Sequence, residues 1–213
     1  MERFIHRLTT PVVLGVVGGI GAGKSFVSCA FVANGAALFD ADREAKKLFE
    51  ENDFIDLCRA RWSEVVDESN AVDFRKLAEI VFAPSSFGQR ELDYLNSIVR
   101  PRVLRKFQEW IADEKRKGTE IAVLDAPLLL EAGWDSLVDY LVFVDASFDV
   151  RLQRVLERGW DRDELIRREA RQMDLKQKKE RSAFTIVTDA SESDVRERVV
   201  AILDAVRNAR KNA

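Results

Sequence analysis

The stretch Gly18-Gly-Ile-Gly-Ala-Gly-Lys-Ser25 decides the fold of this chain. It fits the pattern G-x-x-x-x-G-K-[S/T] in full, and its glycines allow a tight loop whose backbone N–H groups turn toward phosphate oxygens. An apolar run, Val12–Val17, leads into the loop and a helical pattern follows it, which is the context that the pattern requires. The stretch is therefore predicted to be a nucleotide-binding P-loop.

The parts of this loop have distinct expected roles. A helix that starts near Gly23 would add its positive N-terminus to the phosphate site. Lys24 is expected to reach the β- and γ-phosphates, and the hydroxyl of Ser25 is expected to ligate Mg²⁺. The residues expected to contact the nucleotide are Gly19, Ile20, Gly21, Ala22, Gly23, Lys24, Ser25 and Phe26.

Five short apolar runs, each flanked by helical patterning, indicate the strands of a sheet. They are Val12–Val17, Ala36–Phe39, Ile121–Leu124, Tyr140–Val144 and Phe184–Val187. Continuous apolar runs are typical of strands that are buried on both faces, and their alternation with helices favours a parallel sheet covered on both sides. We therefore predict an α/β fold of the P-loop NTPase type, with three layers, α/β/α, and a five-stranded parallel sheet.

A long polar segment, residues 43–118, separates the second run from the third. It contains 15 basic and 15 acidic residues, so it is charge-neutral. Helices are predicted over Phe74–Phe82 and Tyr94–Lys115. Pro101 lies inside the second of these and is a candidate start of a new helix, because proline is tolerated in a first turn.

Residues 151–181 differ from the rest of the chain, since they hold 11 Lys or Arg against 7 Asp or Glu. Two interpretations stand: a solvated helical hairpin, or a mobile lid that brings arginines to phosphates, which we prefer. The candidate arginines are Arg151, Arg154, Arg158, Arg167, Arg168 and Arg171. Guanidinium groups offset the charge of a transferring phosphoryl group, but two or three of them at most can reach one site.

Length and composition are those of an ordinary globular protein with one core. The chain has 213 residues, 46% hydrophobic and 33% charged, with a net charge of −3. Attraction to nucleic acid or to an anionic membrane is not indicated, and no apolar stretch has the length of a membrane span. The N-terminal residues lack the apolar core of a signal peptide. We expect a cytoplasmic protein, plausibly a monomer, without a nucleic-acid or membrane partner.

Cysteine and histidine contribute little chemistry. Cys29 and Cys58 provide neither a disulfide framework nor the spacing of a metal site. Cys29 follows the loop by one helical turn and is predicted to pack in the core. The single histidine, His6, precedes the first strand, so catalysis by histidine and His-rich metal sites are nearly excluded.

Missing motifs narrow the class of nucleotide-binding protein. The chain contains no guanine-reading N-K-x-D motif and no D-x-x-G switch segment, so a GTPase is not indicated. An ATP-driven motor needs tandem acids at a strand end, but Asp125 is followed by Ala126 and Pro127. Asp125 is still expected to hold Mg²⁺ through water; its alternative role is to cap the following turn.

Two acidic residues at the end of the second predicted strand favour transfer to an acceptor. Asp40 and Asp42 lie just past Ala36–Phe39, at the strand end where doubly wound sheets form their ligand crevice. In an extended chain they would point to opposite sides, so one can face the site while the other anchors the loop. Asp42 is the better candidate for the base that accepts the proton of an acceptor hydroxyl. For either aspartate, a helix N-cap is the alternative role.

Several stretches together resemble the dephospho-coenzyme A kinase family. Beside the loop Gly18–Ser25, the family has a D-A-D-x-x-A segment, here Asp40–Ala45, and a D-x-P-L-L-x-E segment, here Asp125–Glu131. It then has a V-D strand end, here Val144-Asp145, and an arginine-containing lid motif, here Gln153–Arg158. The order and spacing of these motifs make the resemblance specific.

The resemblance implies a reaction. The family transfers the γ-phosphate of ATP to the ribose 3′-hydroxyl of 3′-dephospho-CoA, which gives CoA and ADP in the last step of coenzyme A synthesis. It implies that Lys24 contacts the phosphates, that Asp42 is the base, and that Arg158 is the lid arginine nearest the reacting phosphates.

The resemblance also implies a single domain with three regions. The core is expected at residues 11–42, 119–150 and 182–213, the helical acceptor-binding insertion at 43–118, and the lid at 151–181. Two other functions remain open: another small-molecule P-loop kinase, with a nucleoside or sugar acceptor, and a nucleotide-dependent regulatory or nucleic-acid-binding module.

A few positions depart from the family pattern. Phe26 replaces a frequent threonine, so a hydroxyl contact is lost although its backbone N–H remains. Arg100 replaces a histidine before Pro101, and Gly159 replaces an aspartate after the lid arginine. Asp189 stands where an asparagine on the adenine side is common, and we expect the missing amide to alter how the adenine is contacted.

Overall fold

The computed structural model describes residues 11–211. The expectation for His6 falls outside these described residues. The described residues divide into two compact units, one formed by residues 11–40 together with 110–211 and the other by Ala41–Glu109. Each unit is described separately below.

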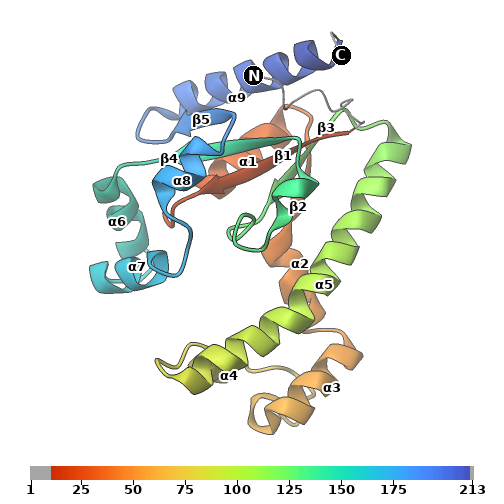
Figure 1. The fold of residues 1–213 in the computed structure, drawn as a ribbon, viewed down its shortest axis with the longest axis vertical. Coiled ribbons are helices and arrows are strands. Elements are labelled where there is room, and N and C mark those ends of the chain that lie inside the picture. Colours follow the sequence, from red (N-terminus) through yellow and green to blue (C-terminus); the bar gives the residue numbers. More distant parts are fainter. Residues whose placement is uncertain (1–10, 212–213) are drawn as a thin grey trace. The chain divides into compact units, whose positions relative to one another are not determined.

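The first unit is built on a five-stranded parallel sheet (Figure 1). Its strands are β1 (Val12–Gly18), β2 (Ala37–Asp40), β3 (Ile121–Asp125), β4 (Tyr140–Asp145) and β5 (Phe184–Val187). They are ordered β2-β3-β1-β4-β5 and every neighbouring pair is parallel. The prediction of an α/β fold with five parallel strands is confirmed, and the predicted apolar runs match the strands closely.

The core explains why the strands are apolar throughout. The helices α1 (Lys24–Ala33) and α9 (Glu192–Lys211) contact each other and the sheet (Figure 1). Leu14 of β1 is fully buried in one cluster with Phe31 of α1 and Leu203 of α9. On the opposite side of β1, a Cβ added to Gly15 would lie 2.9 Å from the side chain of Leu129. Both faces of β1 are therefore covered, as expected for a central parallel strand.

Helix α1 corrects the prediction for Cys29, which is exposed. The buried residues of α1 are Val27, Ser28, Ala30 and Phe31. With 3.6 residues per turn, this buried set defines one face of the helix, and Cys29 falls outside it. The prediction that Cys29 packs in the core was wrong because it ignored the direction of the helical face. Cys58, in contrast, is buried, and burial raises the pKa of its thiol to about 11.

Three short helices follow β4 in the first unit. They are α6 (Phe148–Leu156), α7 (Arg162–Glu169) and α8 (Leu175–Glu180). Asp161 caps α7 by accepting a hydrogen bond from the backbone N–H of Glu164, and Asp174 caps α8 by accepting from the N–H of Lys176. Capping therefore accounts for two of the seven acidic residues of this basic segment.

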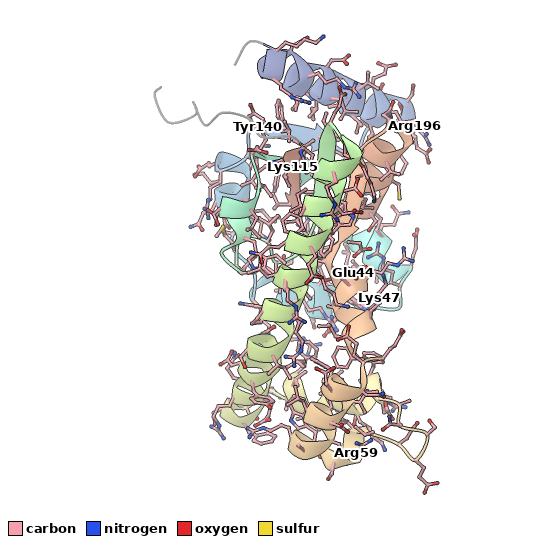
Figure 2. All side chains as sticks on the ribbon, turned by 90° about the vertical axis from the view of Figure 1, so that its right-hand side faces the viewer. Glu44, Lys47, Arg59, Lys115, Tyr140 and Arg196 are labelled. Carbon is pink, nitrogen blue, oxygen red and sulfur yellow. The ribbon has the colours of Figure 1, made fainter. Side chains whose placement is uncertain are left out.

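The second unit is helical. It contains α2 (Ala41–Leu48), α3 (Asn52–Arg61), the 3₁₀ helix Ser63–Val65, α4 (Phe74–Val81) and the first part of α5 (Ser86–Lys117). The predicted helix at Phe74–Phe82 is confirmed. Buried Glu91 accepts hydrogen bonds from Arg61 and from the indole of Trp62, and these bonds hold the pKa of its carboxyl low. On α2, an ion pair joins Glu44 and Lys47, which Figure 2 labels.

Helix α5 does not start anew at Pro101. It begins at Ser86, earlier than the predicted Tyr94, and continues through Pro101 to Lys117. A proline inside a helix costs about 3 kcal/mol, and buried Val103 and Phe107 in the next turns provide packing that offsets this cost. Although α5 is long, neither it nor any other helix within residues 11–211 is apolar enough to cross a membrane.

Candidate active site

The P-loop joins β1 to α1 at the carboxyl edge of the sheet. Gly21 and Gly23 have φ values of 77° and 90°, a region that only glycine adopts without strain. Gly23 is the N-cap of α1, which therefore starts at Lys24, as the sequence predicts. The first turn of α1 leaves backbone N–H groups without helical partners, and these are the groups that bind phosphate in such loops.

The glycines also allow neighbouring segments to approach the loop closely. A Cβ at Gly18 would lie 2.5 Å from the backbone oxygen of Val144, and one at Gly21 would lie 2.7 Å from the backbone oxygen of Arg151. Side chains at these positions would displace β4 or α6. The loop is thus shaped by contacts with the elements behind it as well as by its own flexibility.

Lys24 lies over its own loop. Its ammonium group donates hydrogen bonds to the carbonyl oxygens of Gly18 (3.2 Å) and Gly19 (3.0 Å). The backbone N–H of Ala22 also donates to Gly19 O, at 3.2 Å. The positive charge of Lys24 is therefore held at the same loop whose N–H groups are expected to face a phosphate chain.

Three successive carbonyls of the loop accept hydrogen bonds from side chains outside it. The oxygen of Ile20 accepts from Arg151 at 3.4 Å, that of Gly21 from Arg154 at 3.1 Å, and that of Ala22 from the hydroxyl of Thr188 at 2.7 Å. In a trans peptide the C=O and the next N–H point in opposite directions. Contacts on the carbonyls of Ile20 and Ala22 therefore orient the N–H groups of Gly21 and Gly23 toward the other side of the loop, whereas the N–H of Ala22 donates to Gly19 O.

Arg154 and Thr188 form one connected unit. The guanidinium of Arg154 also donates to the hydroxyl of Thr188 at 3.0 Å and to its carbonyl at 2.8 Å. Thr188 is buried and directly follows β5. Sequence reasoning missed Thr188; the only available signal was its place at a strand end, next to Asp189.

The six candidate arginines of residues 151–181 have different surroundings. Arg151 and Arg154 contact the P-loop, whereas Arg158 is exposed in the loop after α6. Arg167 and Arg168 both pair with Glu164. Arg171 is exposed as well, and Arg168 stacks over the ring of Trp160 at 4.0 Å. Arg151 and Arg154 contact other protein groups: both donate to loop carbonyls, Arg154 also donates to the hydroxyl of Thr188, and Arg151 also pairs with Glu169.

Asp125 ends β3 and is held by α1. The hydroxyl of the buried Ser28 donates a hydrogen bond of 2.8 Å to its Oδ2. Burial raises the pKa of the Asp125 carboxyl; the Ser28 hydrogen bond and the charge of Lys24 oppose this rise, and the charge of Asp40 adds to it. The hydrogen bond involves one carboxylate oxygen, Oδ2, and leaves the other for a water or a metal-bound ligand.

Asp40 and Asp42 end up in different elements. Asp40 is the last residue of β2 and is paired in register with Asp125 of β3, so the two carboxylates lie on the same face of the sheet. Asp42 is exposed in the first turn of α2. The expectation that Asp40 and Asp42 point to opposite sides of an extended chain was wrong for two reasons. Residues two apart in an extended chain lie on the same side, and here the strand ends at Asp40 and the helix begins at Ala41.

Ser25 and Phe26 follow Lys24 in the first turn of α1. The side chain of Ser25 is exposed. The ring of Phe26 packs against the core cluster and lies under the guanidinium of Arg196 at 5.8 Å; Figure 2 labels Arg196 on α9. Phe26 thus contributes packing through its side chain, and only its backbone is available for a phosphate.

Asp189 follows Thr188 after β5. Its carboxylate accepts the backbone N–H of Ser147, at 2.9 Å to one oxygen and 3.2 Å to the other, and this contact lowers its pKa. Asp189 therefore joins the start of α6 to the loop after β5. Within residues 11–211, no group of three or more His, Cys, Asp or Glu side chains has the arrangement of a metal site.

Comparison with known proteins finds close relatives along nearly the whole chain. A family model described as dephospho-CoA kinase matches residues 12–194. The dephospho-CoA kinase of Bacillus licheniformis is 32% identical over 203 residues, which cover 94% of this chain and 99% of the relative. That of Carboxydothermus hydrogenoformans is 34% identical over 195 residues, with 90% and 92% coverage.

Solved structures with a similar fold are also found. The crystal structure of TT1252 from Thermus thermophilus has a TM-score of 0.79 at 28% identity, over 92% of this chain and 97% of that one. Dephospho-CoA kinase from Campylobacter jejuni has a TM-score of 0.63 at 20% identity, over 91% and 96% of the two chains, which supports the fold. With its P-loop, its parallel sheet and the family match over residues 12–194, this chain belongs to the dephospho-CoA kinase family of ATP-dependent kinases, which act in coenzyme A biosynthesis.

Proposed function

We propose that this chain transfers the γ-phosphate of ATP to the 3′-hydroxyl of 3′-dephospho-CoA, with Gly19–Phe26 as the ATP-phosphate site. The observation that supports this most directly is the geometry of the P-loop. Side chains hold three of its carbonyls from outside, and α1 begins at Lys24. A loop whose N–H groups are oriented before the nucleotide arrives loses little entropy on binding.

In the proposed reaction, Lys24 neutralises charge on the β- and γ-phosphates. It already lies at the loop through Gly18 O and Gly19 O, and exchanging these carbonyls for phosphate oxygens keeps its hydrogen bonds satisfied. Arg158 is proposed as the lid arginine that contacts the transferring group, because its side chain is exposed while Arg151 and Arg154 contact protein carbonyls.

Asp42 is proposed as the general base. It would accept the proton of the acceptor hydroxyl while that oxygen forms a bond to the γ-phosphorus and the bond to the β-phosphate oxygen breaks. A carboxylate in the first turn of α2 interacts favourably with the helix dipole. The helical residues 43–118 are proposed to receive the acceptor, and residues 151–181 to act as the lid.

Mg²⁺ is proposed to be held by Ser25 and, through water, by Asp125. Both supply oxygen ligands, which Mg²⁺ prefers, and Mg²⁺ is bound in such sites by one or two protein groups together with phosphate oxygens. The ion would neutralise charge on the β- and γ-phosphates when bound. Ser28 orients Asp125 for this role by its hydrogen bond.

The experiment that tests this proposal is a coupled assay of ADP release with Mg-ATP and 3′-dephospho-CoA, run with wild type and with Asp42→Asn. We expect release that depends on the acceptor and that falls by about 10²–10⁴-fold in the variant, the range typical of general-base removal. Activity of the variant equal to wild type would leave the substrate in place and remove Asp42 from its proposed role. Release that is the same with and without dephospho-CoA, but increases with a nucleoside or sugar, would contradict the proposed acceptor.

A further inference from the structure

Arg151 differs from the other arginines of residues 151–181 in its burial. It lies in the first turn of α6, and only 5% of its surface is exposed. Lys178 is also buried in this segment, but its partners are the side chains of Glu131 and Gln172. A buried guanidinium costs desolvation energy unless its partners are well placed. The groups that surround the guanidinium of Arg151 therefore indicate its role.

The polar partners of Arg151 are a carboxylate on α7 and the P-loop backbone, and its guanidinium also lies over the ring of Phe148, 5.6 Å from the centroid. Its Nη1 donates to Oε1 of Glu169 and, at 3.4 Å, to the carbonyl oxygen of Ile20. A Cβ on Gly19 would lie 3.0 Å from Nη1 and 3.3 Å from the carboxylate of Glu169. The ion pair thus lies directly against the outer side of Gly19 and Ile20.

The backbone of Arg151 contacts the same loop. Its carbonyl oxygen lies 2.7 Å from the position that a Cβ of Gly21 would occupy. Arg151 therefore contacts Gly19 and Ile20 with its side chain and Gly21 with its backbone. A single residue of α6 lies behind three consecutive residues of the phosphate-binding loop.

Stability alone does not explain this ion pair. Two hydrophobic side chains of similar volume usually replace a buried ion pair without loss of stability. In addition, Nε of Arg151 is buried without a hydrogen-bond partner among the described residues, which is a further cost. The ion pair does hold the carbonyl group of Ile20 in place. Two apolar side chains could not do this, since they offer no hydrogen bond to Ile20 O.

We propose that Arg151, held in place by Glu169, is a positioning residue for the P-loop: it fixes the Ile20–Gly21 peptide so that the N–H of Gly21 faces the phosphates of ATP. The C=O of Ile20 and the N–H of Gly21 belong to one planar trans peptide and point in opposite directions. Holding the carbonyl toward Arg151 turns the N–H away from it. Arg151 thereby acts on ATP through the loop and makes no contact with the nucleotide itself. This inference rests on the proposed ATP site.

The test compares Arg151→Met/Glu169→Met, in which both charges are removed together, with wild type. Thermal unfolding is expected to stay within about 3 °C of wild type, because the apolar pair replaces the ion pair. The Kd for Mg-ATP, measured by calorimetry without acceptor, is expected to rise about 10-fold or more, since the Gly21 N–H is no longer held. The KM for dephospho-CoA should stay unchanged.

Two further variants keep the test decisive. Arg151→Lys retains the charge opposite Glu169 but loses the planar fork, so it should fold like wild type and still raise the Kd for Mg-ATP by a factor of about 3 or more. Arg198→Met is the matched control, because Arg198 is exposed on α9, outside residues 151–181, and donates a hydrogen bond to the carbonyl oxygen of Thr185; its Kd should equal that of wild type.

The outcomes separate this inference from the proposed function. An unchanged Kd for Mg-ATP in a folded double variant, or in Arg151→Lys, would overturn the inference while wild-type activity on dephospho-CoA would still stand. If the Kd of the double variant is raised no more than that of Arg198→Met, the inference is overturned as well. If wild type binds Mg-ATP but does not phosphorylate dephospho-CoA, the proposed function is contradicted. The role of Arg151 would still be tested, because the Kd for Mg-ATP of the variants can be compared with that of wild type without any acceptor.

Discussion

The hydroxyl of Ser28 on α1 donates a 2.8 Å hydrogen bond to the carboxylate of Asp125 at the end of β3. This contact joins the helix that follows the P-loop to the strand end that is proposed to hold the metal. It also opposes the rise in the pKa of Asp125 that burial causes. The pair thus influences both the stability of the first unit and its proposed chemistry.

Ser28→Ala is expected to destabilise the protein by about 1.5–3 kcal/mol at neutral pH, the usual value of a hydrogen bond to a charged group. The loss should be smaller in acid, where Asp125 is protonated and the bond joins two neutral groups. Denaturant unfolding at pH 8 and at pH 4 measures both values. Ser193→Ala is a suitable control, since Ser193 is exposed on α9. Equal losses at the two pH values for Ser28→Ala would contradict the assignment of the charge to Asp125.

Asp125→Asn is expected to stabilise the protein at neutral pH and to lower activity. Because the pKa of Asp125 is raised on folding, its contribution to stability is fully present below the unfolded pKa and is lost as pH rises through the folded pKa. The amide avoids this loss, so the advantage of the variant should grow with pH and vanish in acid. Activity should fall by about 10–100-fold, as for a group that orients a metal ligand, and Mg²⁺ titration should show a weaker apparent affinity. A variant that is less stable than wild type at pH 8 would contradict this account.

Gly21→Ala is expected to lose Mg-ATP binding. The φ of 77° is costly for alanine by about 1–2 kcal/mol, and the new methyl group would lie 2.7 Å from the backbone oxygen of Arg151. Gly35→Ala provides the control: its φ is 90°, but a Cβ there meets nothing within 4 Å. The control should lose stability through strain alone and keep the Kd for Mg-ATP. If both variants bind Mg-ATP equally well, close packing behind the loop has no effect on the site.

Arg158→Ala is expected to lower kcat and to leave the fold unchanged. An arginine on the transferring phosphoryl group contributes about 10³–10⁵ in rate, and Arg158 is exposed, so its removal should not alter the melting temperature. We also expect more ADP release without acceptor relative to turnover, since an incomplete lid excludes water less well. Arg167→Ala serves as a control, because Arg167 pairs with Glu164 on the surface. A normal kcat in Arg158→Ala would assign the phosphate contact to another group.

Local patterns predicted much of the fold because each depends on neighbours in the chain. The strands follow from apolar runs, and the start of α1 follows from the glycines of the loop. The helix through Pro101 could not be predicted in this way, because propensity disfavours proline and the packing of Val103 and Phe107 decides the outcome. The exposure of Cys29 was missed for a related reason, since the buried face of α1 is defined only by what packs against it.

In the candidate site, too, some features follow from local sequence patterns and others depend on the tertiary structure. By itself the sequence determined the P-loop, the parallel sheet and the acidic strand ends, because these depend on residue type and short spacing. Only the tertiary structure decided that Arg151, Arg154 and Thr188 hold the loop carbonyls and that Ser28 holds Asp125. A basic segment attracts phosphate and carbonyl oxygens alike, and the choice between them depends on which atoms the fold brings within hydrogen-bond distance. Residues more than a hundred positions apart in the chain make these contacts, and no local pattern specifies them.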